Sequence, residues 1–149
     1  MKINVRDDYY EKIGKNLKKF RKQYPALYHH CRRTAVISYM IAIYMGLVQE
    51  DAQEIAIGAI LHDIGKTELP DKILQKKERL SMEQFEVIRR HSELGYQMVE
   101  NSEKLSDVCK NIILKHHEKL DGSGYPHGIK KIPLHVQIVT ISSAESPLL

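Results

Sequence analysis

The stretch "VCKNIILKHHEKLDGSGYP", from Val108 to Pro126, joins an apolar helical pattern to a glycine-rich break. Val108, Ile112 and His116 recur at the spacing of one helix face, and His117 follows one step round that face. Turn chemistry explains the glycines and the proline that end the helix. It does not explain two adjacent imidazoles at the end of an apolar face. Their role depends on which other side chains of the chain can meet them.

The rest of the chain shows the same helical periodicity, so we predict an all-α fold. Ser81 and Gln84 form the pattern of a capping box, which predicts a helix start. Gly65 is typical of a glycine cap at a helix C-terminus. Helices are predicted over residues 5–24, 27–45, 49–65, 81–100, 104–118 and from 133 onward, with a connector over 67–80.

The basic residues are concentrated at one end of the chain. The 149 residues are enough for one domain, and their net charge is +4. Residues 1–25 contain eight Lys and Arg against three Asp and Glu, whereas the remainder holds 15 against 16. We therefore divide the chain into a basic helix over 1–25, a candidate linker from an upstream domain, and a domain over 26–149. Such a helix is usually a solvated surface, so nucleic acid is not an expected partner.

One segment, Thr34 to Val48, runs for 15 residues without a charge. It is short for a membrane span and contains tyrosines, so we interpret it as a central buried helix and expect no membrane association. Cys31 and Cys109 lie within helical patterns and show no CxxC spacing. We expect reduced thiols and, because the N-terminus has no apolar leader, a cytoplasmic protein.

Histidines fall on or beside the apolar face of four predicted helices. Any one of them, taken alone, is best interpreted as a hydrogen-bonded core residue. Burying all of them separately is unfavourable, because each unpartnered polar group costs on the order of several kcal/mol. A shared metal centre would satisfy them together, since neutral imidazole and carboxylate are both ligands for first-row transition metals. The candidate ligands are His30, His62, Asp63, His91, His116 and His117.

Six such groups exceed what one four-coordinate ion can use. Two divalent transition-metal ions bridged by Asp63 form the simplest arrangement that uses them all. Pairs of metal ions a few ångströms apart are a standard device for hydrolysing phosphodiesters. The residues therefore favour a two-metal hydrolase over separate core histidines.

Four segments in order resemble the HD-GYP subgroup of the HD superfamily of metal-dependent phosphohydrolases. The segment "HCRRTA" (30–35) is similar to the family's first histidine with an arginine three residues on, and "LHDIGK" (61–66) to its HD signature. The segment "LSMEQFEVIRRHSELGYQM" (80–98) is similar to the part that carries the next histidine. The segment "HHEKLDGSGYP" (116–126) then supplies the double histidine and the GYP loop. A lone His-Asp pair is weak evidence, but four ordered motifs are specific.

The resemblance implies an HD-domain helical bundle in which the six candidate ligands hold two metal ions, iron or manganese. Members of this family typically hydrolyse cyclic di-GMP, with a water beside Asp63 attacking phosphorus. The resemblance makes Asp63 catalytic and places Lys66 at the substrate phosphate, where it offsets developing negative charge. It also places Gly124, Tyr125 and Pro126 at the site entrance, in contact with the cyclic dinucleotide or with a partner signalling domain.

The sequence departs from the family at two positions. Ala26 stands where some members carry a glutamate that supports a third metal, which favours two metals here. Ser143 stands where the family has an aspartate that completes the metal shell. Glu145 lies two residues further, about 200° round a helix, and is a poor substitute. We therefore interpret the domain as C-terminally truncated or degenerate.

The leading functional hypothesis is a phosphodiesterase that opens cyclic di-GMP at a two-metal site. One alternative is a metal-binding or regulatory module of the same fold, catalytically weakened by the loss of the last aspartate. The other alternative is a phosphohydrolase for another nucleotide. Turnover of cyclic di-GMP separates the first hypothesis from the second, and a substrate panel separates it from the third.

Overall fold

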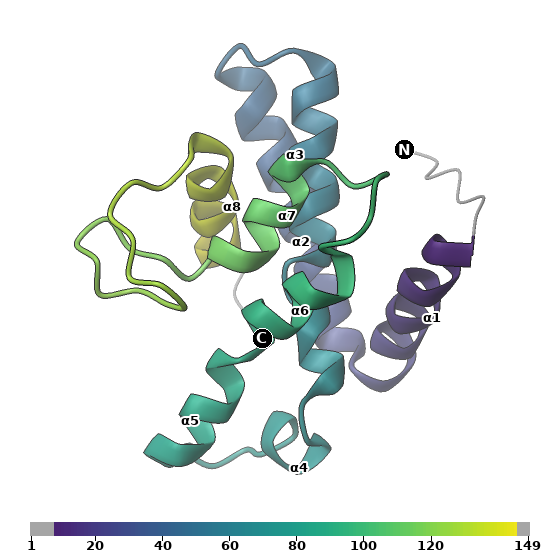
Figure 1. The fold of residues 1–149 in the computed structure, drawn as a ribbon, viewed down its shortest axis with the longest axis vertical. Helices are drawn as coiled ribbons and strands as arrows, with labels where there is room; N and C mark the ends of the chain where they lie inside the picture. Colours follow the sequence, from purple (N-terminus) through teal and green to yellow (C-terminus); the bar gives the residue numbers. More distant parts are fainter. Residues whose placement is uncertain (1–7, 146–149) are drawn as a thin grey trace.

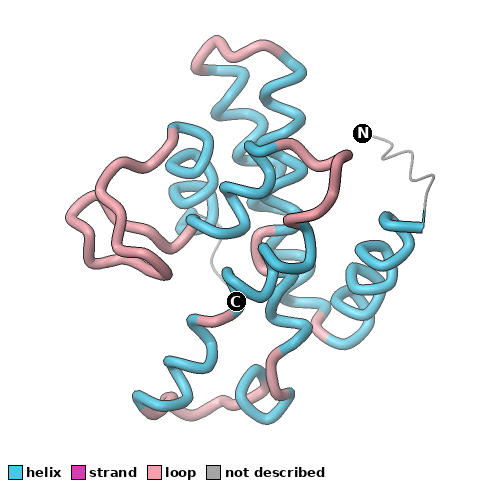
Figure 2. The backbone as a smooth tube through the Cα atoms, viewed as in Figure 1, coloured by secondary structure: helices cyan, strands magenta, loops and turns pink. Residues whose placement is uncertain are grey.

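The computed structural model describes residues 8–145, and this part of the chain contains only helices and loops (Figure 1, Figure 2). The all-α prediction is therefore confirmed. In chain order the elements are α1 (Asp8–Gln23), α2 (Pro25–Tyr44), α3 (Gln49–Leu61), the 3-10 helix η1 (Ile64–Glu68), α4 (Asp71–Leu74), α5 (Met82–Arg89), α6 (His91–Val99), α7 (Asp107–Lys115) and α8 (Leu134–Glu145).

The centre of the fold is an antiparallel pair formed by α2 and α3, against which α7 and α8 pack (Figure 1). Small side chains such as Ala42 and Ala59 are fully buried at these contacts, which lets the helices approach closely. Ile112 from α7 and Val139 from α8 complete the cluster with no exposed surface. Burial of such a side chain stabilises the fold by about 1.5–3 kcal/mol.

A second buried cluster joins η1, α6 and α7, and it corrects the prediction for Gly65. The residue does not cap α3, because α3 ends at Leu61 and Gly65 lies inside η1 without a positive φ. A Cβ atom there would lie 2.5 Å from the Gly95 nitrogen and would overlap the His91 carbonyl. Glycine is required because η1 and α6 touch through their backbones.

The single helix predicted over 81–100 is two helices, because the chain bends between α5 and α6. The capping box at its start is confirmed: Ser81 Oγ accepts from the Gln84 amide, and Gln84 Oε1 accepts from the Ser81 amide. At the bend the Arg90 amide donates to the Val87 carbonyl, a shorter-range bond than an α-helix makes. The bend makes His91 the first residue of α6.

The outer face of α2 corrects the central-buried-helix interpretation of residues 34–48. Thr34 and Ser38 point into the core, but Val36, Met40 and Tyr44 are 60%, 64% and 93% exposed. The helix is therefore buried on one side only. Within the described residues, no helix combines the length and apolar character needed to cross a bilayer.

The N-terminal helix α1 packs against α2 rather than standing apart from the domain (Figure 1). Phe20 is completely buried with Tyr24 and Cys31. Cys31 and Cys109 are free thiols, as expected, and both are buried. Residues 5–7 of the predicted first helix lie outside the described part, and a linker role for residues 1–25 stays a prediction.

Candidate metal centre

Four helical segments bring the six candidate ligands into one place. His30 lies on the inner face of α2, and His91 opens α6. The other four residues follow helix ends: His62 and Asp63 come directly after α3, and the double histidine comes directly after α7. Two groups have ligand atoms close enough to hold an ion, and Asp63 belongs to both: Asp63, His91, His116 and His117 form one, and His30, His62 and Asp63 form the other.

The Asp63 carboxylate lies at the junction of the two groups and turns a different oxygen toward each. Oδ1 lies 3.2 Å from His91 Nε2 and 3.6 Å from His116 Nε2. Oδ2 lies 3.4 Å from His62 Nε2 and accepts a hydrogen bond of 3.0 Å from Lys66 Nζ. This is the geometry that a carboxylate bridging two cations requires.

The tautomers of three histidines follow from their backbone partners. His62 Nδ1 lies 2.6 Å from the Ala59 carbonyl, His91 Nδ1 lies 2.6 Å from the Ile88 carbonyl, and His116 Nδ1 lies 3.0 Å from the Ile113 carbonyl. A carbonyl can only accept, so each neutral ring carries its proton on Nδ1 and a lone pair on Nε2.

These lone pairs converge in a way that fits a cation. His91 Nε2 and His116 Nε2 are only 3.1 Å apart, and both face Asp63 Oδ1. Two lone pairs at that separation repel each other unless a proton or a metal ion lies between them. The buried donors are nitrogen and carboxylate oxygen, the ligands of first-row transition metals. The residues therefore fit a metal centre.

The pKa shifts hold Asp63, His116 and His117 in the forms that bind metal, whereas His62 is held in its protonated form and must lose a proton to bind a metal ion. Burial lowers the pKa of His116 to about 4, so this imidazole is neutral near pH 7. Burial also lowers the pKa of His117, with the adjacent His116 acting in the same direction. Burial alone would raise the pKa of Asp63, but the Lys66 ammonium and His62 hold it well below its ordinary value. Burial opposes the charged form of His62, yet the Asp63 carboxylate raises the pKa of that imidazole well above its ordinary value.

Ser143 lies beside the first histidine, on the last helix. Its Oγ is 3.2 Å from His30 Nε2. Ser143, where the family resemblance led us to expect an aspartate, thus faces the group of His30, His62 and Asp63. It offers a neutral hydroxyl there and not a carboxylate. The side chain of Glu145 lies outside the described side chains.

The residues from Gly124 to Pro126 lie against the double histidine. The Tyr125 ring stacks on His117 with centroids 4.6 Å apart and planes inclined by 16°. A Cβ at Gly124 would lie 2.5 Å from Glu118 Cα, so only glycine fits between the loop and the end of α7. Pro126 follows through a cis peptide bond.

Glu118 is a buried residue of this region that the sequence interpretation missed. It is 2% exposed, and its two carboxylate oxygens accept hydrogen bonds from the amides of His127 and Ile129, at 2.7 and 3.1 Å. These bonds tie the glycine-rich loop over residues 119–133 back to the double histidine. The feature of the sequence that could have identified Glu118 is its place, as an acidic residue directly after two histidines at the end of an apolar helix.

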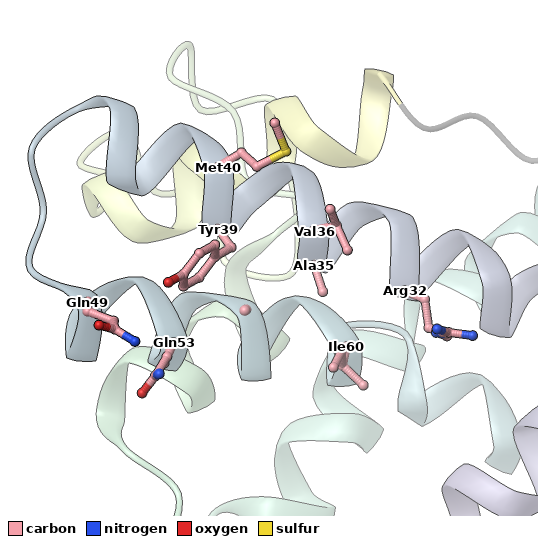
Figure 3. A pocket seen from close by; sticks show the side chains of 9 residues that line it. Arg32, Ala35, Val36, Tyr39, Met40, Gln49, Gln53 and Ile60 are labelled. Carbon is pink, nitrogen blue, oxygen red and sulfur yellow. The ribbon is translucent and has the colours of Figure 1, made fainter. Parts of the chain in front are cut away.

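A groove of about 720 Å³ lies between α2 and α3 (Figure 3). Tyr39 and Met40 line it from α2, and Gln49 and Gln53 line it from α3. None of the residues that line it is a candidate ligand. The groove is therefore separate from the imidazole cluster.

The buried His and Asp cluster agrees with the comparison to known proteins. A family model described as an HD domain matches residues 19–144. The chain belongs to the HD domain family. This HD domain is 36% identical over 120 residues to the cyclic di-GMP phosphodiesterase response regulator RpfG of Xanthomonas campestris pv. campestris, covering 78% of the chain and 32% of that protein.

A second relative carries a different substrate in its name. The HD domain is 35% identical over 116 residues to the 3'3'-cGAMP-specific phosphodiesterase 2 of Vibrio cholerae, covering 76% of the chain and 22% of that protein. The chain thus spans a third or less of the length of these two relatives.

Solved structures show the same fold. Bd1817 of Bdellovibrio bacteriovorus, described as a HDG"Y"P protein, superposes with a TM-score of 0.68 at 27% identity, over 78% of this chain and 39% of that one. The PgpH HD domain of L. monocytogenes, in complex with cyclic-di-AMP, has a TM-score of 0.66 at 22% identity, over 86% and 68%. The resemblance read from the four sequence motifs is confirmed.

Proposed function

We propose that this HD domain is a metal-dependent phosphodiesterase that hydrolyses cyclic di-GMP at a two-metal site. The observation that carries the proposal is the Asp63 carboxylate, whose two oxygens face two separate groups of histidines. Relatives named as cyclic di-GMP phosphodiesterases support the choice of substrate.

The ligands divide between two unequal positions. The first would be held by His91, His116, His117 and Asp63 Oδ1, and the second by His30, His62 and Asp63 Oδ2. Iron and manganese suit this mixture of imidazole and carboxylate. When bound, two such ions would activate a water for attack on phosphorus and neutralise charge on the phosphate.

The remaining roles belong to groups at the edge of the cluster. Asp63 remains ionised because Lys66 and His62 depress its pKa, so it can hold the cluster together and orient an attacking water. The Lys66 side chain is 15% exposed, which leaves its ammonium able to meet a substrate phosphate and offset charge in the transition state. Gly124, Tyr125 and Pro126 would line the entrance, against the cyclic dinucleotide or a partner signalling domain.

A second candidate function is a metal-binding regulatory module with weak or no turnover. Ser143 favours it, because a hydroxyl beside His30 cannot supply the negative charge of an aspartate. A misplacement of about 1 Å in a reacting group can lower a rate on the order of a hundredfold. Under this second candidate, the chain binds metal and turns cyclic di-GMP over slowly or not at all.

A third candidate is a phosphodiesterase for another cyclic dinucleotide. The relative from Vibrio cholerae that is named for 3'3'-cGAMP favours it. A panel of cyclic di-GMP, 3'3'-cGAMP and cyclic di-AMP, assayed under one metal supply, separates this candidate from the first.

The experiment that tests the proposal combines elemental analysis with chromatography of the products. We expect close to two iron or manganese ions per chain after supply of either metal, and lower occupancy in His116→Ala and His117→Ala. A chain that binds no metal after supplementation would refute the metal centre. Variants that retain full metal and lose only thermal stability would show that the two imidazoles serve packing.

A further inference from the structure

Metal-binding histidines need a fixed ring orientation, and three rings of the cluster obtain it from the backbone. A ligating histidine almost always donates its second ring N–H to a carbonyl or carboxylate, which fixes both tautomer and ring plane. His62, His91 and His116 do so through Nδ1, to the carbonyls of Ala59, Ile88 and Ile113. Each partner lies one helical turn before its histidine.

His117 is oriented differently. Among the residues that the structure describes, none accepts a hydrogen bond from its ring. The Tyr125 ring stacks on it instead, nearly parallel, with 4.6 Å between centroids. The neighbouring rings of His91 and His116 meet His117 at steep angles of 89° and 47°, so Tyr125 supplies the only parallel surface among these three rings.

The backbone places the Tyr125 ring over His117. The Tyr125 amide donates to the His117 carbonyl at 3.2 Å, which joins the two residues a second time. Gly124 allows this approach, because any side chain there would overlap the end of α7. Glu118 holds the far side of the loop through the amides of His127 and Ile129. The loop is therefore fixed to the end of α7 both before and after Tyr125, and this holds the Tyr125 ring in place over His117.

An arginine completes the arrangement from α5. The Arg89 guanidinium carbon lies over the Tyr125 ring, 4.7 Å from its centroid. Arg89 Nη1 is held in turn by Glu86 at 2.7 Å. A guanidinium is attracted to the face of an aromatic ring, so Arg89 favours the orientation in which the Tyr125 ring faces it.

We propose that Tyr125, supported by Arg89, is a positioning residue that fixes the ring of His117 for metal binding. The ring stack does for His117 what a backbone carbonyl does for His62, His91 and His116. The inference rests on the proposed metal centre. It gives Tyr125 the role of orienting a metal ligand, a role that does not depend on substrate. The aromatic face carries this role, and the hydroxyl does not.

The test measures Co²⁺ binding to the metal-free chain against a competing chelator. The visible absorption of bound Co²⁺ is recorded as well, because it reports coordination geometry. Removal of a group that orients a ligand typically lowers metal affinity 10–100-fold. We expect that loss and an altered spectrum for Tyr125→Leu, which keeps apolar bulk without a flat ring. Tyr125→Phe keeps the ring and should keep the affinity and the spectrum of the parent. Tyr44→Leu, at a residue 93% exposed, is the matched control and should change neither readout.

Two further variants make every outcome decisive. Arg89→Met removes the cation at an exposed site and should weaken Co²⁺ binding about threefold, which tests the proposal even if Tyr125→Leu does not fold. If His117→Ala weakens binding while the Tyr125 and Arg89 variants keep the parent's affinity and spectrum, the positioning role is wrong and the metal centre stands. If the parent chain itself binds no Co²⁺, both proposals are overturned.

Discussion

Replacing Gly65 by alanine should disrupt the metal centre although Gly65 is not a ligand, because the new side chain would push η1 away from α6, the helix that begins with His91. The new Cβ would lie 2.5 Å from the Gly95 nitrogen and 2.8 Å from the His91 carbonyl carbon, whereas ordinary contacts begin at 3.4 Å. Because both neighbours are backbone, η1 and α6 must separate by about 1 Å. Overpacking of this kind costs about 3 kcal/mol, the upper part of its usual range. For a chain of this length that corresponds to a melting temperature lower by about 6–12 °C.

The displacement would also separate Asp63 from His91, because one precedes η1 and the other opens α6. We expect metal affinity to fall on the order of tenfold or more. Urea unfolding of the metal-free chain and a Co²⁺ titration measure the two effects.

Two other glycines provide a graded control series. Gly95→Ala would meet the Ile113 side chain at 3.0 Å, which can move, and the Gly65 nitrogen at 3.2 Å, a milder backbone contact than that of Gly65→Ala, so we expect a cost of about 1–2 kcal/mol. Gly14→Ala meets nothing within 4 Å in the middle of α1 and should stabilise the chain by about 0.5–1 kcal/mol. A Gly65→Ala variant as stable as the parent, or an order of stabilities other than Gly14, Gly95, Gly65, would refute the backbone-contact argument.

Two further predictions concern the ligands themselves. Ser143→Asp should tighten binding of the second metal ion about 10–100-fold, because it adds an anion beside His30; unchanged occupancy in a metal titration would show that another residue completes that position. His116 has a pKa of about 4 in the folded chain and near 6.5 in the unfolded chain. Between pH 6.5 and 4 the folded chain therefore binds fewer protons than the unfolded chain, so the free energy of unfolding falls as pH falls. Relative to His116→Gln, the metal-free chain should lose about 3 kcal/mol between pH 6.5 and 4 in urea unfolding; parallel curves would contradict the shift.

The histidine cluster could be anticipated from sequence because each ligand lies on or directly after a helical pattern with apolar residues, where an unpartnered polar group is costly. The helix faces helped less: α7 is amphipathic, but α2 carries Val36 and Met40 on its exposed side, so periodicity alone does not give the inward direction of His30. The double histidine was predicted to lie within a helix, but α7 ends at Lys115. His116 and His117 still lie close to the other ligands, as predicted, because the turn that follows α7 continues in nearly the direction of the helix.

What could not be anticipated depends on contacts between distant segments. Gly65 follows an apolar helix and so resembles a cap, whereas its actual constraint is the backbone of α6. The bend at Arg90 carries neither glycine nor proline, and local sequence gives no signal for it. Glu118 binds amides nine and eleven residues away in an irregular loop, a pairing that no periodicity encodes.

The ends of α3 and α7 have a consequence for the order in which ligands can arrive. Both helices point their C-termini at the cluster, since they stop at Leu61 and Lys115, immediately before His62 and His116. A helix C-terminus carries a partial negative charge of roughly half an electron. Together with the ionised Asp63, the two ends favour a cation among the imidazoles, whereas the Lys66 ammonium beside Asp63 and the N-terminus of α6 at His91 offer positive charge to a phosphate. Under the proposed function, the negative charge of a cyclic dinucleotide would be most favourably placed after metal has bound, so we expect the metal to bind first.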